Sequence, residues 1–296
     1  MARTIVISHP DKVLFPDDGI SKGELAGYYE AIAPAMLPHM RARPVTMERY
    51  PNGLNGQGFL QKDVIKGFPE WLERVEAPKK GGTVHYPLVS DERSLLWMAN
   101  QNCITPHVWT SRAPDLYEPD VCVFDLDPSE DEPKVLRAAA LALRGLLAEI
   151  GLAAWVKTSG SKGFHILVPL DGKARMDEAA AFAYEVAEVL VSRDPDHLTL
   201  EFTKAQRGGR ILVDTRRNDW AATFAAAYAV RARPGAPVSA PCTWEEVESG
   251  AVKPQTFNLR NMPKRIDAAG ELWSDMPKHA RSLDHATERL RQLRPA

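Results

Sequence analysis

Residues 121–128 read VCVFDLDP, a short apolar run that ends in two carboxylates one residue apart. The run is apolar throughout before it turns acidic, which predicts a buried β-strand closed by Pro128. Successive side chains of a strand point to opposite faces, so Asp125 and Asp127 share one face while Leu126 points into the core. Two carboxylates in a low dielectric repel each other unless a proton or a cation lies between them, and Mg²⁺ or Mn²⁺ is suited to that place. A solvated strand end is the alternative interpretation.

The composition is that of an ordinary globular protein. Of the 296 residues 44% are hydrophobic and 26% are charged, which is enough for one compact unit with two lobes. The cysteines lack the paired spacing of a disulfide framework or a zinc ribbon and therefore indicate a reducing cytoplasm. These residues are Cys103, Cys122 and Cys242. No stretch reaches the roughly 18 uninterrupted apolar residues of a membrane span, so we expect neither export nor insertion.

The net charge of −2 at pH 7 argues against a protein that coats nucleic acid indiscriminately. Such binding comes from neutralised phosphates and is accompanied by an excess of basic residues. Any nucleic-acid site must therefore be local, with its cations gathered on one face.

A helix is predicted to begin after Ser21, which has capping-box spacing to Glu24. Lys22 falls in the first turn, where a cation opposes the helix dipole. That cost is understandable if the lysine and the free amides together face an anion such as phosphate. A plain surface lysine is the alternative.

Glycines place Phe59 on a loop or a strand edge, with basic residues nearby. An exposed aromatic beside cations suits stacking on nucleic-acid bases. A core position for Phe59 is the alternative, and His107, as a lone histidine, is most simply structural.

The turn SGSKG at residues 159–163 is the second notable feature, since it lies between predicted strands at 155–158 and 164–170. Small residues let backbone amides approach an oxyanion, while the serine hydroxyls, Lys162 and His165 offer donors to phosphate oxygens. The turn is not a Walker motif, because its spacing and the element that follows are wrong. A plain hairpin loop is the alternative.

A third acid, Asp214, ends the apolar strand predicted at 211–214, and this position mirrors that of Asp127. A sheet that places the two strands side by side would bring all three carboxylates together. Helical spacing further predicts helices at 133–150 and 177–191. Apolar residues predict a strand at 198–202 and another at the stretch 228–234, which carries further cations out of it.

Six segments in this order resemble the polymerase domain of bacterial DNA ligase D, a member of the archaeo-eukaryotic primase superfamily. They are residues 11–16, 51–53, 124–128, 158–165, 213–214 and 230–234, and the resemblance covers most of the chain. It implies an α+β fold, in which a primase-like catalytic core with an RRM-like sheet joins a second, α/β N-terminal lobe, and the active site lies in the cleft between them. Residues 1–296 would form a single domain, with an N-terminal lobe of about residues 1–115 and a catalytic lobe with its C-terminal extension at 116–296.

The resemblance implies that Asp125, Asp127 and Asp214 bind two divalent ions, Mn²⁺ or Mg²⁺. One ion would lower the pKa of a primer 3′-hydroxyl, and the other would hold the incoming triphosphate and stabilise the leaving pyrophosphate.

Further roles follow from the same resemblance. The phosphates of the nucleotide, a ribonucleoside or deoxynucleoside triphosphate, would be held by Ser159, Lys162, His165 and Arg231, with a contribution from Arg49. Lys12 and Lys22 match lysines that grip a 5′-phosphate at a DNA gap or break. Phe59 corresponds to an aromatic residue that stacks on the template, and His107 to a histidine near the active site. Glu48 stands where the family can have a basic residue.

The implied function is that of a template-directed nucleotidyltransferase, a DNA-dependent DNA or RNA primase-polymerase. It would add nucleotides to a primer 3′-hydroxyl at gaps or double-strand breaks with 5′-phosphate ends, in repair by non-homologous end joining or gap filling. Its partners would be such DNA, a DNA ligase and a Ku-type end-binding protein, at the nucleoid in the cytoplasm. Two alternatives from other classes are a haloacid-dehalogenase-like phosphatase, which shares the Asp-x-Asp strand end, and a non-catalytic DNA-end binding module.

Overall fold

The computed structural model describes residues 5–293, whose contacts divide into two compact units. Unit 1 comprises the residues up to 116 together with the segments 223–240 and 257–271. Unit 2 comprises residues 117–222, 241–256 and those from 272 onward. The segments 223–240 and 257–271 of unit 1 fall in the range 116–296 that the sequence analysis assigns to the second lobe.

Unit 2 is built on a sheet whose strands, among the described residues, run in the order β11-β12-β8-β10-β9-β14. Apart from the short β11 and η2 between α4 and β12, the unit follows the path β8, α3, β9, β10, α4, β12 along the chain, which is the β-α-β-β-α-β order of ferredoxin-like folds and of the RRM sheet. The RRM-like sheet predicted from the sequence is confirmed. The strands are β8 (Val121–Asp127), β9 (Trp155–Thr158), β10 (Phe164–Pro169), β11 (Leu198–Thr199), β12 (Ile211–Asp214) and β14 (Pro241–Cys242).

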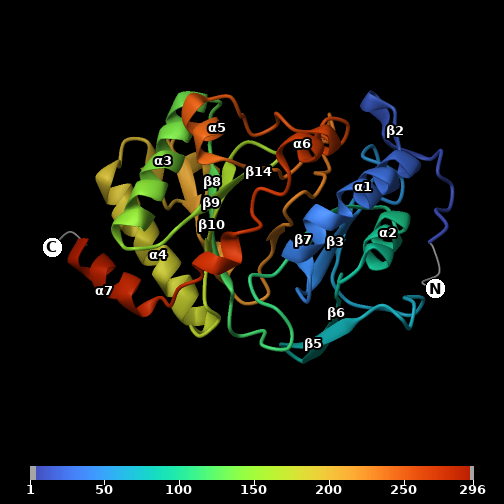
Figure 1. Cartoon of the computed structure of the whole chain (residues 1–296), viewed down its shortest axis with the longest axis horizontal. Coiled ribbons are helices and arrows are strands. Elements are labelled where there is room, and N and C mark those ends of the chain that lie inside the picture. Colours follow the sequence, from blue (N-terminus) through green and yellow to red (C-terminus); the bar gives the residue numbers. More distant parts are fainter. Residues whose placement is uncertain (1–4, 294–296) are drawn as a thin grey trace. The chain divides into compact units, whose positions relative to one another are not determined.

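Helices α3 (Pro133–Glu149) and α4 (Met176–Arg193) pack on one face of this sheet (Figure 1). Phe124 and Leu126 are fully buried, whereas the side chain of Asp127 keeps 47% of its surface exposed. The acids therefore lie on the face that these two helices leave open. The other helices of unit 2 are α5 (Trp244–Ser249), α7 (Asp284–Leu293) and the 3₁₀ turns η2 (Lys204–Gln206), η3 (Arg216–Asn218) and η4 (Met276–His279).

Unit 1 contains an antiparallel sheet of order β13-β7-β3-β4. Helix α1 begins at the N-cap Ser21 with both hydrogen bonds of the capping box to Glu24, as the sequence predicts. The strands of unit 1 are β1 (Val13–Phe15), β2 (Ile20–Ser21), β3 (Val45–Arg49), β4 (Phe59–Gln61), β5 (Arg74–Lys79), β6 (Gly82–Pro87), β7 (Cys103–Val108) and β13 (Phe224–Ala225). Its helices are α1 (Lys22–Met40), α2 (Glu92–Asn100), α6 (Met262–Ala269) and the 3₁₀ turn η1 (Pro16–Asp18).

The strand predicted from Tyr228 is wrong. Tyr228 has a φ of 67°, in the left-handed region, which interrupts any extended run. Val230 and Val238 pair in an isolated bridge instead, and Arg231 follows without regular secondary structure.

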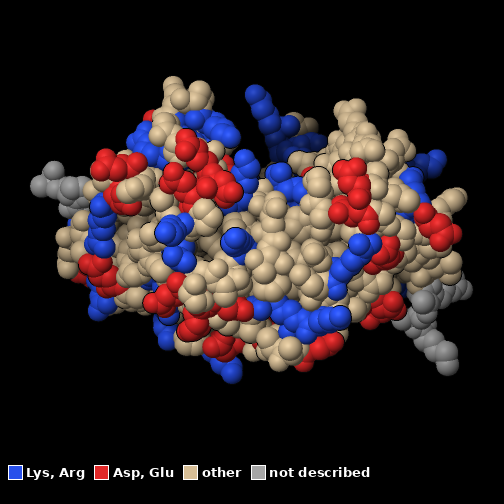
Figure 2. Space-filling model, turned by 90° about the horizontal axis from the view of Figure 1, so that it is seen from above, with Lys and Arg blue, Asp and Glu red and all other residues tan. Residues whose placement is uncertain are grey.

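Charges of both signs are interspersed over the face of the molecule shown in Figure 2, in keeping with the net charge of −2. Within residues 5–293, no helix combines the length and the apolar character that a membrane crossing requires.

Candidate active site

A row of polar side chains crosses four strands of the unit 2 sheet. Asp214 is the register partner of Asp125, Asp125 that of His165, and His165 that of Lys157. Residues directly opposite one another on antiparallel strands point to the same face. Asp127, two residues after Asp125, joins the same face. We refer to these five residues, Lys157, His165, Asp125, Asp127 and Asp214, as the polar row.

Two arginines hold the acids of the polar row. The Arg217 guanidinium donates to Asp125 Oδ2 from Nε at 3.3 Å and from Nη2 at 3.1 Å, and its Nη2 lies 3.6 Å from Asp214 Oδ2. Arg207 Nη1 donates to Asp127 Oδ2 at 2.9 Å. Neither arginine was identified as a site residue from the sequence, where Arg207 lies in a short basic stretch at residues 204–210. The feature of the sequence that could have pointed to them is that both are cations close to a strand that ends in an acid.

The environment of Asp125 has opposing effects on its pKa. Burial raises the pKa of the Asp125 carboxyl, Arg217 lowers it, and the charges of Asp214 and Asp127 raise it again. The net result is a pKa above the ordinary aspartate value of 3.8. Burial, more than the neighbouring acids, is therefore what disfavours the charged form of Asp125.

The donor set of the polar row fits a hard divalent ion, because carboxylate oxygens are the ligands that Mg²⁺ and Mn²⁺ prefer. Among residues 5–293, however, no three His, Cys, Asp or Glu side chains converge as a ready-made set of ligands. One oxygen each of Asp125 and Asp127, Oδ2 in both, accepts hydrogen bonds from a guanidinium. An ion that binds these oxygens would compete with the guanidiniums.

His165 is oriented from both sides of its ring. Lys157, which is fully buried, places Nζ 2.7 Å from His165 Nδ1, and His165 Nε2 lies 3.4 Å from Asp125 Oδ1. A lysine ammonium can only donate, so Nδ1 accepts and the ring hydrogen belongs on Nε2. Lys157 was missed from the sequence, because alternation in a predicted strand shows only that it shares a face with Trp155, and the register with β10 is what places it beside His165.

The loop at 159–163 is closed by its own serine. Ser159 Oγ accepts hydrogen bonds from the backbone nitrogens of Ser161 and Gly163, both at 3.1 Å. A Cβ at Gly163 would lie 1.7 Å from the carbonyl oxygen of Leu126, so glycine is required where the loop crosses β8. The Ser159 hydroxyl thus shapes the loop, and Lys162 is its exposed cation.

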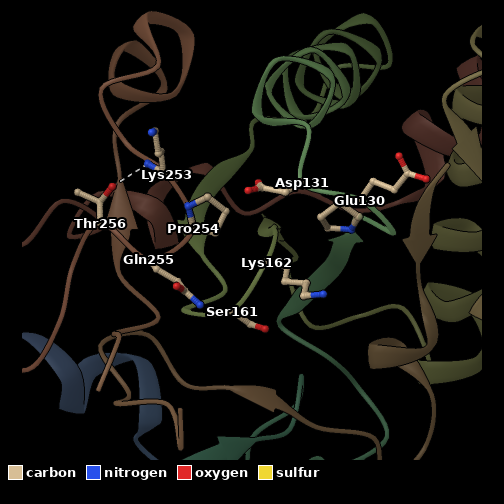
Figure 3. A pocket seen from close by; sticks show the side chains of 9 residues that line it. Glu130, Asp131, Ser161, Lys162, Lys253, Pro254, Gln255 and Thr256 are labelled. Carbon is tan, nitrogen blue, oxygen red and sulfur yellow. Dashed lines mark hydrogen bonds between the residues drawn. The ribbon is translucent and has the colours of Figure 1, made fainter. Parts of the chain in front are cut away.

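Lys162 opens onto a pocket of about 480 Å³ within unit 2 (Figure 3). Acids and bases share its wall, since Glu130 and Asp131 join Lys162 and Lys253. On the far side, the Lys253 backbone nitrogen donates to Thr256 Oγ1 at 2.8 Å, the dashed line of Figure 3. A nucleotide phosphate approaching Lys162 would therefore meet mixed charges.

In unit 1, Arg49 and Phe59 form a pair on neighbouring strands. The Arg49 guanidinium lies 5.4 Å from the centre of the Phe59 ring and donates from Nε to the Gln101 carbonyl at 2.8 Å. Arg49 also donates to the side chain of Gln61. Phe59 is 46% exposed on β4, at the edge of the sheet, so it is not the core residue of the alternative interpretation.

Glu48 and His107 pair in the same sheet, with 3.0 Å between Glu48 Oε2 and His107 Nε2. Burial raises the pKa of the Glu48 carboxyl, but the hydrogen bond and charge of His107, with smaller effects of Thr105 and Arg231, outweigh it and leave the pKa below 4.5. Arg231 therefore lies near this pair. Its backbone nitrogen donates to the Pro237 carbonyl at 2.7 Å.

Lys22 is buried, with 3% of its surface exposed, and so is not a plain surface lysine. Its Nζ donates to the carbonyl oxygen of Ser8 at 2.8 Å and to Ser8 Oγ at 2.9 Å. Burial, and next the charge of Lys12, lowers the pKa of Lys22. The charges of the two lysines thus repel each other, and hydrogen bonds to Ser8 attach Lys22 to the N-terminal segment.

The predicted site residues form two groups, one in each unit. Unit 2 brings together the three acids, the 159–163 loop and His165. Unit 1 holds the remaining ones, which are Lys12, Lys22, Arg49, Phe59, His107 and Arg231.

Comparison with known proteins gives consistent matches. The family described as LigD, primase-polymerase domain, matches residues 21–273. A multifunctional non-homologous end joining protein LigD of Mycolicibacterium smegmatis is 35% identical over 293 residues, which are 98% of this chain and 38% of that protein. Another protein of that name, from Pseudomonas aeruginosa, is 36% identical over 91% of this chain and 32% of its own length. The chain thus spans well under half of these curated relatives.

A solved structure, the polymerase domain from Mycobacterium tuberculosis ligase D in complex with DNA, matches with a TM-score of 0.88 and 34% sequence identity. The match covers 93% of this chain and 99% of that one. The match in sequence and the match in fold therefore cover nearly the same part of this chain.

Proposed function

Since the chain belongs to the LigD primase-polymerase domain family, we propose that it is a metal-dependent, template-directed nucleotidyltransferase that extends primer 3′-hydroxyls at DNA gaps and breaks. Membership of this family implies that the chain is a polymerase-type nucleotidyltransferase, and it argues against the haloacid-dehalogenase-like phosphatase that the sequence left as an alternative. The observation that carries the active-site assignment is the polar row, in which three acids from two neighbouring strands share the open face of the sheet.

Asp125, Asp127 and Asp214 would hold two divalent ions, Mn²⁺ or Mg²⁺. When bound, such ions lower the pKa of a primer hydroxyl and neutralise the triphosphate and the leaving pyrophosphate. His165 contributes an Nε2 hydrogen that Lys157 keeps in place, aimed along the row towards Asp125. A donor held in this way is suited to a phosphate oxygen next to the acids.

The nucleotide phosphates would also be held by Lys162 and by the loop that Ser159 shapes, and Arg231 and Arg49 are proposed to contribute. Lys12 and Lys22 would recognise the 5′-phosphate of the DNA, and Phe59 would stack on the template with His107 nearby. The exposed Phe59 ring beside the Arg49 guanidinium supports the stacking role, because aromatic and cationic groups together favour single-stranded bases.

The names of the relatives support a place in non-homologous end joining, and the DNA in the M. tuberculosis complex supports DNA as the substrate. Ribonucleoside and deoxynucleoside triphosphates are the proposed co-substrates. A DNA ligase and a Ku-type end-binding protein are the proposed protein partners, at the nucleoid in the cytoplasm.

Primer extension tests the proposal. The protein is incubated with a 5′-phosphorylated gapped duplex, one nucleotide type at a time, and Mn²⁺, Mg²⁺ or EDTA. We expect templated addition with a divalent ion and none in EDTA. Asp127→Asn should abolish addition, whereas Asp131→Asn, which alters an exposed acid of the neighbouring pocket, is the matched control for charge. Extension in EDTA, or by Asp127→Asn at the wild-type rate, would refute the metal assignment.

A further inference from the structure

One guanidinium lies between the two most buried acids of the polar row. The side chains of Asp125 and Asp214 are 13% and 7% exposed, and Arg217 contacts both from the 3₁₀ turn that follows β12. Its contact with Asp125 is two-pronged, through Nε and Nη2, and the same Nη2 faces Asp214. A single positive charge thus spans the two carboxylates.

The turn that carries Arg217 is fastened to the sheet by its neighbour. Asn218 is buried, accepts from the Val123 backbone nitrogen at 2.8 Å and donates to the Val123 carbonyl at 2.7 Å. It thereby continues the hydrogen bonding of β8 two residues before Asp125. The arginine backbone is consequently fixed beside the acids, while its side chain keeps 40% of its surface exposed and has room to turn towards solvent.

A guanidinium and a divalent ion compete for the same oxygens. A hard ion needs carboxylate oxygens at about 2.0–2.6 Å, and an arginine that donates to Asp125 Oδ2 occupies a lone-pair direction of the atom an ion would use. Without a counter-charge the two carboxylates would repel each other, because both side chains are largely buried. If an ion replaces the arginine, the carboxylate oxygens become free to bind it and the carboxylates still keep a positive counter-charge.

We propose that Arg217 is the resident counter-cation of Asp125 and Asp214, and that a divalent ion must displace it in order to bind. This inference rests on the proposed function, since it takes the two acids as ligands. It adds that the chain lowers its own affinity for the ion through a residue that is not a ligand. The arginine holds the acids in register until the ion arrives.

The test is equilibrium Mn²⁺ binding, followed by the electron paramagnetic resonance signal of free Mn²⁺ and by calorimetry, without DNA or nucleotide. Arg217→Gln removes the competitor. Arg216→Gln is the matched control, because it removes the same charge from the adjacent residue, whose exposed guanidinium lies 4.0 Å from the centre of the Phe202 ring. We expect Arg217→Gln to bind Mn²⁺ about five- to twentyfold more tightly than Arg216→Gln, the range for losing a partly buried charged hydrogen bond.

Thermal unfolding provides a second readout. In EDTA, Arg217→Gln should unfold at a lower temperature than the wild type, and Mn²⁺ should stabilise the variant by a larger increment. Arg217→Lys, which keeps the charge but loses the fork that spans two acids, should bind Mn²⁺ with intermediate affinity.

Equal Mn²⁺ affinities for Arg217→Gln and Arg216→Gln, with wild-type binding intact, would overturn the inference and leave the proposed function standing. The same holds if Arg217→Lys binds as tightly as Arg217→Gln. Failure of the wild type to bind Mn²⁺, or binding by Asp125→Asn as tight as that of the wild type, would overturn both.

Discussion

Asp214 lies directly opposite Asp125 on the neighbouring antiparallel strand, and both carboxylates face the guanidinium of Arg217. The two residues are far apart in the chain, and the pairing of β12 with β8 alone makes them neighbours. Negative charge concentrated in this way is useful for holding cations and costly for the fold, a trade-off that mutation can expose.

The first prediction concerns this cost at Asp125. Because its pKa is raised above 3.8, the folded state favours the protonated carboxyl, and the ionised form destabilises the fold at pH values above the folded pKa. Asp125→Asn should therefore raise the free energy of unfolding in EDTA at neutral pH, and this gain should shrink as the pH falls through the folded pKa. Nucleotide addition should fall at least about a hundredfold.

Thermal unfolding of wild type and Asp125→Asn in EDTA across this pH range measures the effect on stability. Asp131→Asn should change neither stability nor rate appreciably. A variant that unfolds earlier than the wild type at neutral pH would contradict the prediction.

A second prediction concerns the buried lysine of the polar row. Lys157→Met removes the donor to His165 Nδ1, so the ring hydrogen is free to move from Nε2 to Nδ1. We expect kcat to fall about tenfold or more, as for other groups that orient a catalytic histidine. Lys157→Gln, which keeps a donor, should recover part of the loss. Nitrogen-15 spectra of the His165 ring report the tautomer directly, and an Nε2-protonated ring in Lys157→Met would disprove the positioning role.

The third prediction uses the Glu48–His107 pair. The lowered pKa of Glu48 means that its ionised form contributes stability above its unfolded pKa of about 4.5 and that this contribution disappears as the pH falls through the folded pKa. Glu48→Gln should lower the free energy of unfolding by about 1 kcal/mol near neutral pH and by almost nothing in acid. Glu76→Gln is the control, since Glu76 meets His85 at 3.1 Å in an exposed pair. Urea titrations of both variants at two pH values provide the comparison, and equal losses would refute the prediction.

Gly163 provides a fourth prediction, about the loop that borders the acids. In Gly163→Ala the new methyl group would clash with the Leu126 carbonyl, so either the loop or β8 must shift. We expect a loss of about 3 kcal/mol or more. Gly145→Ala, in the exposed part of α3 with no atom within 4 Å of the new Cβ, should instead stabilise by about 0.5–1 kcal/mol. Denaturant unfolding of both variants measures these changes. A Gly163→Ala variant with the wild-type free energy of unfolding would show that the close approach is not maintained in solution.

The last prediction concerns 5′-phosphate recognition. Lys12→Ala together with Lys22→Ala should reduce the preference for 5′-phosphorylated over 5′-hydroxyl gaps, and removing each well-formed lysine–phosphate hydrogen bond should cost about 1.5–3 kcal/mol of binding free energy. Because Lys22 already bonds to Ser8, the single variant Lys12→Ala should account for the larger share. Extension of an open template-primer should change little. Binding titrations against both DNA ends are the measurement, and an unchanged preference in the double variant would remove this role.

Features that depend on neighbours in the chain could be predicted from the sequence. The capping box at Ser21 and Glu24 involves residues three apart, and the shared face of Asp125 and Asp127 follows from the alternation of any strand. The order of strands and helices around 121–214 was likewise visible in local periodicity, and with the resembling segments it led to the RRM-like sheet.

Only the tertiary structure decided which strand lies beside which, and with it the register that sets Lys157, His165, Asp125 and Asp214 in one row. It also decided that Arg217 is the partner of two acids, that Phe59 is exposed, and that residues 223–240 belong with unit 1. The reason is physical. Hydrogen bonds within a turn and the alternation of a strand are settled over a few residues, whereas strand pairing and side-chain ion pairs join residues that only the packing of the whole unit brings together.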